Sequence, residues 1–130
     1  MLRRFICCLL IVIPLTATAS NTVNLETTMK NMGLALKQAR EAASPQAAKP
    51  YINNLSALTE QAKAAPFPDD KAHTYLEGLN KVQLTLQRAQ VAADANDNET
   101  LQQALAEVEQ LRRAYHKHRK VSFWQLLFGN

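Results

Sequence analysis

The sequence has few of the residues that reinforce small proteins covalently. Its 130 residues include two cysteines, Cys7 and Cys8, and both lie within the first ten positions. Beyond them the chain cannot form a disulfide, a zinc–thiolate site or the Cys-x-x-Cys-His attachment of a covalent haem. It also lacks a glycine-rich phosphate loop and a nucleophile elbow. Packing alone must therefore stabilise most of the chain, and the common motifs of nucleotide-binding proteins and hydrolases are missing.

Residues 1–19 have the pattern of a cleaved secretory signal peptide. Arg3 and Arg4 precede an apolar stretch of eleven residues that a proline interrupts. A retained membrane anchor would need about 20 apolar residues, so this stretch is too short to span a bilayer. Ala17-Thr18-Ala19 has the small residues that signal peptidase accepts, and we expect cleavage before Ser20. The sequence therefore predicts export to the periplasm.

The remaining chain is patterned for helices. Apolar and small residues recur at steps of three and four in four segments, residues 25–39, 51–65, 72–93 and 101–115. This spacing places apolar groups along one side of a helix. No segment alternates with a period of two, so we expect no sheet. We predict one small all-α domain over residues 20–120.

Helix-boundary residues separate these segments. The expected caps and turns are Asn24, Ser44 followed by Pro45, Asp69 or Asp70 after Pro66-Phe67-Pro68, and Asn96-Asp97-Asn98-Glu99. In the last of these, asparagine tolerates the left-handed conformation and can then cap the next helix. Three short connections place neighbouring helices antiparallel, which predicts an up-down-up-down four-helix bundle.

Met29 and His116 lie at matching depths in this topology. The start of the first helix lies beside the end of the last, where the polar–apolar pattern stops near Lys120. At ~1.5 Å rise per residue, both side chains lie roughly 6 to 8 Å from the same end. A thioether and an imidazole facing each other there could hold an iron. Taken singly, such a methionine is usually core filler, and such a histidine often only complements the helix dipole.

Two motifs resemble the soluble periplasmic cytochrome b562 family. The first helix of that family reads Leu-Glu-x-x-Met with a later Leu-Lys, matched by Leu25, Glu26, Met29, Leu36 and Lys37. The last helix reads Arg-x-Ala-Tyr-His, matched by Arg112, Ala114, Tyr115 and His116. The resemblance covers the chain from its expected cleavage site to Lys120, and the second motif is the more specific one.

The resemblance implies a non-catalytic electron carrier with one non-covalent haem b. Met29 and His116 would be the axial ligands of the iron, which leaves no open position for oxygen and raises the potential. Arg112 would lie along the haem edge. The residues expected to wall the haem are Met32, Leu55, Tyr75 and Leu79. Tyr75 and Leu79 stand where the family commonly has phenylalanines, and the hydroxyl of a buried tyrosine needs a partner.

Other candidate ligands match the pattern less well. Met32 shares a face with Met29 but lies deeper and outside the family motif. His118 lies about 200° around the helix from His116, so we expect it to face solvent. His73 matches no metal-binding spacing. No Glu-x-x-His motif is present, which argues against a di-iron carboxylate centre.

Five basic residues lie near the end of the last helix: Arg112, Arg113, Lys117, Arg119 and Lys120. They can act as a solvated helix end that complements the dipole, as partners of haem propionates, or as a docking surface for an acidic protein. Export removes a protein from nucleic acid, so we expect no nucleic-acid partner. The presence of these basic residues does not by itself show which of the three roles they have.

Residues 121–130 form an apolar extension beyond the resemblance. Its large apolar side chains are Phe123, Trp124, Leu126, Leu127 and Phe128. The segment is too short to span a bilayer, but after a basic run it can contact a membrane surface or a partner protein. It can equally fold back on its own bundle or fray.

Two functions remain open from the sequence. The first is a periplasmic haem protein that exchanges electrons with unidentified redox partners. The second is a haem-free periplasmic bundle that acts as a binding or stress-adaptor module. The matched depth of Met29 and His116 favours the first, because a haem-free bundle has no need of both residues there.

Overall fold

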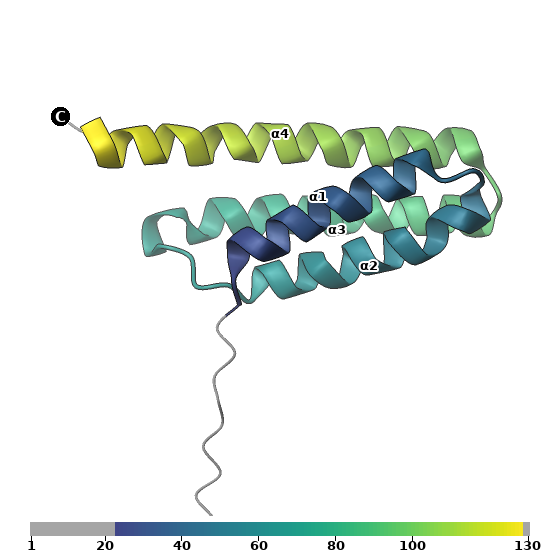
Figure 1. The fold of residues 1–130 in the computed structure, drawn as a ribbon, viewed down its shortest axis with the longest axis horizontal. Coiled ribbons are helices and arrows are strands. Elements are labelled where there is room, and N and C mark those ends of the chain that lie inside the picture. Colours follow the sequence, from purple (N-terminus) through teal and green to yellow (C-terminus); the bar gives the residue numbers. More distant parts are fainter. Residues whose placement is uncertain (1–22, 129–130) are drawn as a thin grey trace, which may run out of the picture.

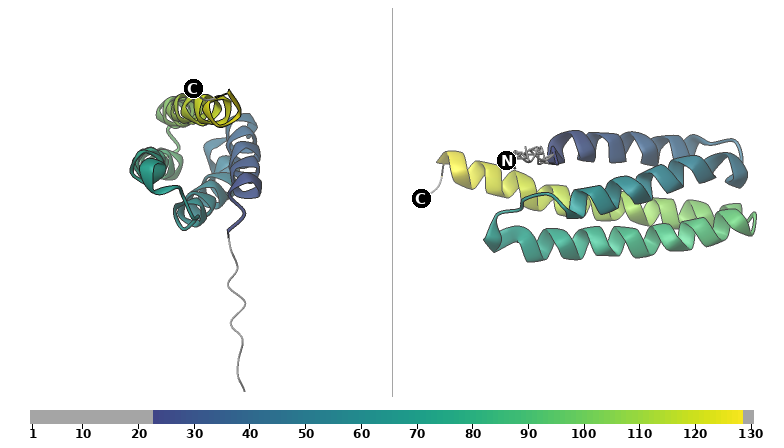
Figure 2. Two further views of the ribbon diagram at one scale, coloured as in Figure 1. Left: turned by 90° about the vertical axis from the view of Figure 1, so that its left-hand side faces the viewer. Right: turned by 90° about the horizontal axis from the view of Figure 1, so that it is seen from below.

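The four expected helices form an antiparallel bundle. The computed structural model describes the backbone of residues 23–128 and the side chains of residues 23–116. The helices are α1 (Leu25–Glu41), α2 (Pro45–Lys63), α3 (Asp69–Asp94) and α4 (Asn98–Phe128), with no strand in the described part. Figure 1 shows consecutive helices running in opposite directions, and Figure 2 shows them in chain order around the bundle axis. The predicted all-α four-helix bundle is confirmed.

The first two helices begin at the predicted caps. The side chain of Asn24 accepts a hydrogen bond from the backbone amide of Thr27 at 3.1 Å, and α1 starts one residue after the cap. The hydroxyl of Ser44 accepts one from the amide of Ala47 at 3.1 Å, and Pro45 is the first residue of α2. Each side chain satisfies an amide that has no carbonyl partner in the first turn of its helix.

The other two boundaries differ in detail from the expectation. α3 begins at Asp69 without a side-chain cap, so the predicted capping role of Asp69 or Asp70 is wrong. Both carboxylates lie inside the first turn, where they complement the helix dipole instead. Asn96 takes the left-handed conformation as expected, with φ 55°. The cap of α4 is Asp97, whose carboxylate accepts from the amide of Thr100 at 3.1 Å.

α4 is longer than its sequence pattern suggests. Its backbone stays helical to Phe128, past Lys120, and Figure 1 shows it extending beyond the start of α1. The side chains of His118 and of residues 121–130 lie outside the described ones, as does the whole expected signal peptide. Within the described part of the chain, no helix is both long and apolar enough to cross a membrane.

The core is densest toward the end of the bundle that carries the α1–α2 and α3–α4 connections. Ile52, Leu86, Leu101 and Leu105 are fully buried there, among alanines that let the helices approach closely. α1 and α4 touch each other less than the other neighbouring helices do. At the opposite end, Met29 and other residues of the apolar helix faces are therefore only partly buried. The helices enclose a cavity there.

Candidate functional site

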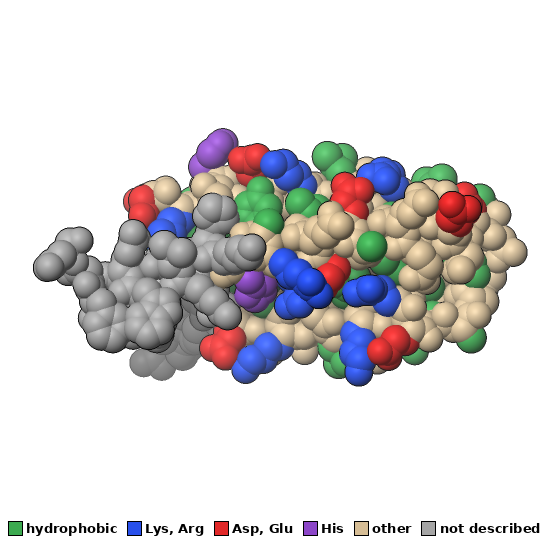
Figure 3. Space-filling model, turned by 90° about the horizontal axis from the view of Figure 1, so that it is seen from above, with side chains coloured by type: hydrophobic (Ala, Val, Ile, Leu, Met, Phe, Trp, Pro, Cys, Tyr) green, Lys and Arg blue, Asp and Glu red, His purple; other side chains and the backbone are tan. Residues whose placement is uncertain are grey.

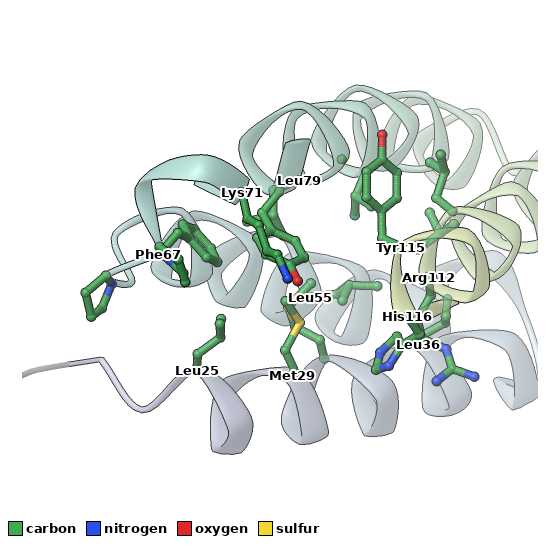
Figure 4. A pocket seen from close by; sticks show the side chains of 18 residues that line it. Leu25, Met29, Leu36, Leu55, Phe67, Lys71, Leu79, Arg112, Tyr115 and His116 are labelled. Atoms are coloured by element: carbon green, nitrogen blue, oxygen red, sulfur yellow. The ribbon is translucent and has the colours of Figure 1, made fainter. Parts of the chain in front are cut away.

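A cavity of about 340 Å³ lies at the end of the bundle where α1 begins. Its walls come from all four helices and from the α2–α3 connection, residues 64–68, and most of the lining side chains are apolar. Figure 4 shows these side chains converging from α1 below, α3 above and α4 at one side. The volume lies at the small end of the range of about 300–1,000 Å³ usual for cofactor pockets.

Every site residue predicted from the sequence lines this cavity. These residues are Met29, Met32, Leu55, Tyr75, Leu79, Arg112 and His116. They come from four different helices, so their gathering depends on the antiparallel topology and on the relative offset of the helices. Lining a cavity does not assign a chemical role, and the roles of these residues toward a cofactor stay predictions.

Met29 and His116 enter the cavity from α1 and α4. Met29 lies one turn inside α1, and Figure 4 shows its sulfur pointing away from the helix into the cavity. The imidazole of His116 lies between α4 and α1 and is partly buried. Neutral imidazole and thioether groups are both ligands that haem iron accepts. The pair can therefore supply two ligands from opposite chain ends to one cavity.

The other methionine and histidine candidates take different positions. Met32 also lines the cavity, one turn further along α1 than Met29. Its presence in the cavity wall therefore does not decide which of the two methionine sulfurs would be the iron ligand. His73 is exposed on α3 and does not line the cavity, as its spacing suggested. No group of three or more His, Cys, Asp or Glu side chains that could hold a metal occurs in the described part.

Arg112 is held by a carboxylate on its own helix. Its Nε and Nη2 donate to the two oxygens of Glu109 at 2.9 and 2.8 Å, and Nε of Arg113 donates to the same carboxylate at 2.9 Å. The hydrogen bond from Arg112, opposed by burial, lowers the pKa of Glu109 to about 2. The same bond raises the pKa of Arg112. A cofactor carboxylate that reaches Arg112 thus meets a cation that is already largely neutralised.

Glu109 was missed in the sequence analysis, although a local signal was present. Residues three and four positions apart are neighbours on a helix surface, so Glu109 can reach both Arg112 and Arg113 without help from another helix. The basic cluster is accordingly less positive than its composition indicates. Figure 3 shows Lys and Arg interspersed with Asp and Glu over the coloured part of this face. The remaining members of the cluster lie outside the described side chains.

An aromatic pair forms one wall of the cavity. The rings of Phe67 and Tyr75 stack with centroids 5.3 Å apart and planes 29° apart. Phe67 comes from the α2–α3 connection, which carries it back against α3. Offset stacking of this kind adds to the stabilisation from burial. The connection therefore adds a second aromatic ring to the wall that Tyr75 forms on α3.

Lys71 and Gly78 also line the cavity and were not singled out in the sequence. Lys71 lies four residues before Tyr75 on α3, so helical spacing could have placed it on the same stripe. Figure 4 shows its side chain extending along the cavity. Apart from Arg112, it is the only Lys or Arg among the described lining residues. Within residues 23–116, Lys71 forms no salt bridge.

Comparison with known proteins identifies the family of the chain. The family model described as Cytochrome b562 matches residues 24–120, which span all of α1, α2 and α3 and most of α4. The chain belongs to the cytochrome b562 family. Membership in this family indicates a haem-binding electron-transfer protein rather than an enzyme. A search of curated proteins gave no match.

Proposed function

We propose that this cytochrome b562 family member is a periplasmic one-electron carrier that binds haem b without a covalent link, with Met29 and His116 as the axial ligands. The observation that carries the proposal is their convergence. One thioether and one imidazole, from the first and last helices, line the same mostly apolar cavity within the region that matches the family.

The residues that line the cavity are suited to binding haem b. Leu55 and Leu79 are buried apolar walls, and the Phe67–Tyr75 stack offers a flat aromatic surface. An apolar porphyrin would be shielded from water by these side chains. Lys71 and Arg112 provide cationic groups that could pair with the propionates of the haem. Arg112 would share its guanidinium between a propionate and Glu109. No cysteine occurs among residues 9–130, so none of the described lining residues offers a thiol for a covalent attachment.

Two side chains would define the redox behaviour. Haem iron supplies the one-electron exchange when it is bound, and a histidine with a methionine fills both axial positions. The soft sulfur of Met29 would favour the reduced iron of a bound haem and so would raise its reduction potential. The unbranched side chain of methionine adapts readily to an irregular cavity, which suits a ligand on the less crowded α1–α4 side.

An absorption spectrum with matched variants tests the proposal. Wild-type protein given haem b should bind one equivalent and show a low-spin six-coordinate spectrum. His116→Ala and Met29→Ala should each lose the low-spin form, because one axial ligand is removed. Met32→Leu and His73→Ala are the controls and should keep it. A wild-type protein that never takes up one equivalent of haem would instead support a haem-free binding module.

The proposed location has a separate test. The arginines and the small-residue pattern before Ser20 support export, since secretory signals have this arrangement. We expect the protein recovered from a periplasmic extract to begin at Ser20. Recovery of the intact chain from the cytoplasmic fraction, with Met1 still present, would contradict export.

A further inference from the structure

Gly78 lies in the interior of α3, where glycine is an unfavourable choice. A glycine in the middle of a helix costs about 1 kcal/mol relative to alanine. Its backbone does not explain its presence, because no described glycine has a positive φ. Gly78 is also buried. The reason for a residue without a side chain at this position must therefore lie in what packs against it.

The ring of Tyr115 occupies the space that a side chain at position 78 would need. A Cβ at this position would lie 2.7 Å from Cε1 and 2.8 Å from both Cδ1 and Cζ of Tyr115. All three atoms belong to one rigid ring, so they cannot move apart separately. Real Cβ atoms essentially never approach other heavy atoms so closely. Gly78 thus lets a tyrosine of α4 lie directly on the backbone of α3.

The contact with α3 has a second component. Figure 4 shows Tyr115 extending from α4 toward α3, with its hydroxyl directed away from the cavity. Lys81, one turn after Gly78, pairs with Glu77 at 2.7 Å; this pair raises the pKa of Lys81, and Tyr115 acts in the same direction. The body of the ring therefore lies against α3 at Gly78, and its hydroxyl lies near Lys81 on the same helix.

Tyr115 directly precedes His116, and the helix geometry couples the two side chains. Successive residues of an α-helix are separated by about 100° around the axis. With Tyr115 directed at α3, His116 is turned toward α1, and Figure 4 shows the two rings in these directions. α4 touches α3 far more extensively than it touches α1, so α3 is the main surface against which α4 is packed.

We propose that Gly78 is a positioning residue, whose missing side chain seats Tyr115 on α3 and thereby sets the rotation of α4 that directs His116 into the cavity. The importance of that direction for ligation rests on the proposed function, whereas the contact itself does not. The second described glycine provides a contrast, because a Cβ at Gly33 on α1 would meet no atom within 4 Å.

Melting of the haem-free full chain tests the contact. Gly33→Ala should raise the melting temperature, because alanine favours the helix and finds open space. Gly78→Ala should lower it in the wild-type background. In a Tyr115→Ala background the same Gly78→Ala change should raise it, since the obstructing ring is gone. A rise for Gly78→Ala in the wild-type background would show that the ring is not seated there and would overturn the proposal.

Haem binding and the imidazole resonances of His116 test the positioning. At a temperature where both variants are folded, Gly78→Ala should bind haem b at least tenfold more weakly and lose low-spin character, and Gly33→Ala should match the wild type. In the haem-free proteins, the nuclear magnetic resonance signals of the His116 ring should shift in Gly78→Ala alone. If Gly78→Ala does not fold, Tyr115→Ala should show the same shift.

The outcomes separate the two proposals. Unchanged His116 resonances and unchanged haem binding in a destabilised Gly78→Ala protein would mean that the contact only packs the bundle, and the positioning role would be wrong. A wild-type protein that takes up no haem would refute the proposed function. In that case the reversal of the Gly78→Ala effect and the His116 resonances would still decide whether Gly78 positions the ring.

Discussion

Replacing Glu109 with glutamine should destabilise the haem-free bundle by about 1 kcal/mol near neutral pH. The pKa of Glu109 is lowered from 4.5 to about 2, first by its hydrogen bond from Arg112. At about 1.4 kcal/mol per pKa unit, the shift sets a ceiling of about 3 kcal/mol. Glu109 is 15% exposed, but its partners Arg112 and Arg113 are 44% and 72% exposed. Solvent therefore screens much of the attraction, which leaves about 1 kcal/mol.

The pH dependence of this difference follows from the direction of the shift. A carboxyl whose pKa is lowered on folding stabilises the protein above its ordinary pKa, and the stabilisation disappears as the pH falls through the folded value. The gap in stability between wild type and Glu109→Gln should therefore stay constant from pH 7 to about pH 5. It should shrink below that and vanish near pH 2, the folded pKa of Glu109.

Urea unfolding of both haem-free proteins at several pH values measures the gap. Glu107→Gln is the matched control, because Glu107 lies on the same helix and pairs with Arg88 at 2.8 Å, but its side chain is 45% exposed. The Glu107→Gln substitution should lower the free energy of unfolding by less than about 0.5 kcal/mol. Equal losses for the two variants, or a gap for Glu109→Gln that persists unchanged to pH 2, would refute the reasoning.

Two further predictions concern the core and the tail. Leu86→Ala should cost about 2–5 kcal/mol in the free energy of unfolding, because Leu86 is fully buried, whereas Leu84→Ala at a 63% exposed position should cost less than about 0.5 kcal/mol. Similar losses would contradict the assigned core. Removing residues 121–130 should leave haem binding intact but weaken association with anionic vesicles, which the emission of Trp124 reports by a blue shift that salt reverses. Emission that is already blue in the free protein and indifferent to vesicles would mean that the tail packs on the bundle.

Much of the fold could be predicted from the sequence, because helix caps and helical periodicity depend on residues close together in the chain. Asn24 and Ser44 could be recognised as caps because the amides that they satisfy lie only three residues away. The heptad-like spacing of apolar residues predicted the helices for the same reason, since it depends on neighbours along one turn. At the start of α3 the capping role was wrong, because the helix begins one residue earlier than a cap at Asp69 would allow and Pro68 takes the cap position.

The approximate position of the candidate site was also readable. Met29 and His116 could be placed at one end of the bundle because helices have a constant rise and the connections are short. The resemblance of the two motifs to one family added the expected chemistry, and the match over residues 24–120 supports the family. The paired ligand role remains a prediction that the spectrum must test.

The contacts between helices were decided only by the tertiary structure. The sequence showed that Phe67 lies between two prolines. It did not show that the α2–α3 connection places the centroid of the Phe67 ring 5.3 Å from that of Tyr75. It showed a glycine at position 78, but not that the ring of Tyr115 fills the space beside it. Periodicity identifies the face that a helix buries and leaves its rotation and offset open by a fraction of a turn. Packing of the whole bundle fixes those two quantities, and with them the walls of the cavity and the direction of His116.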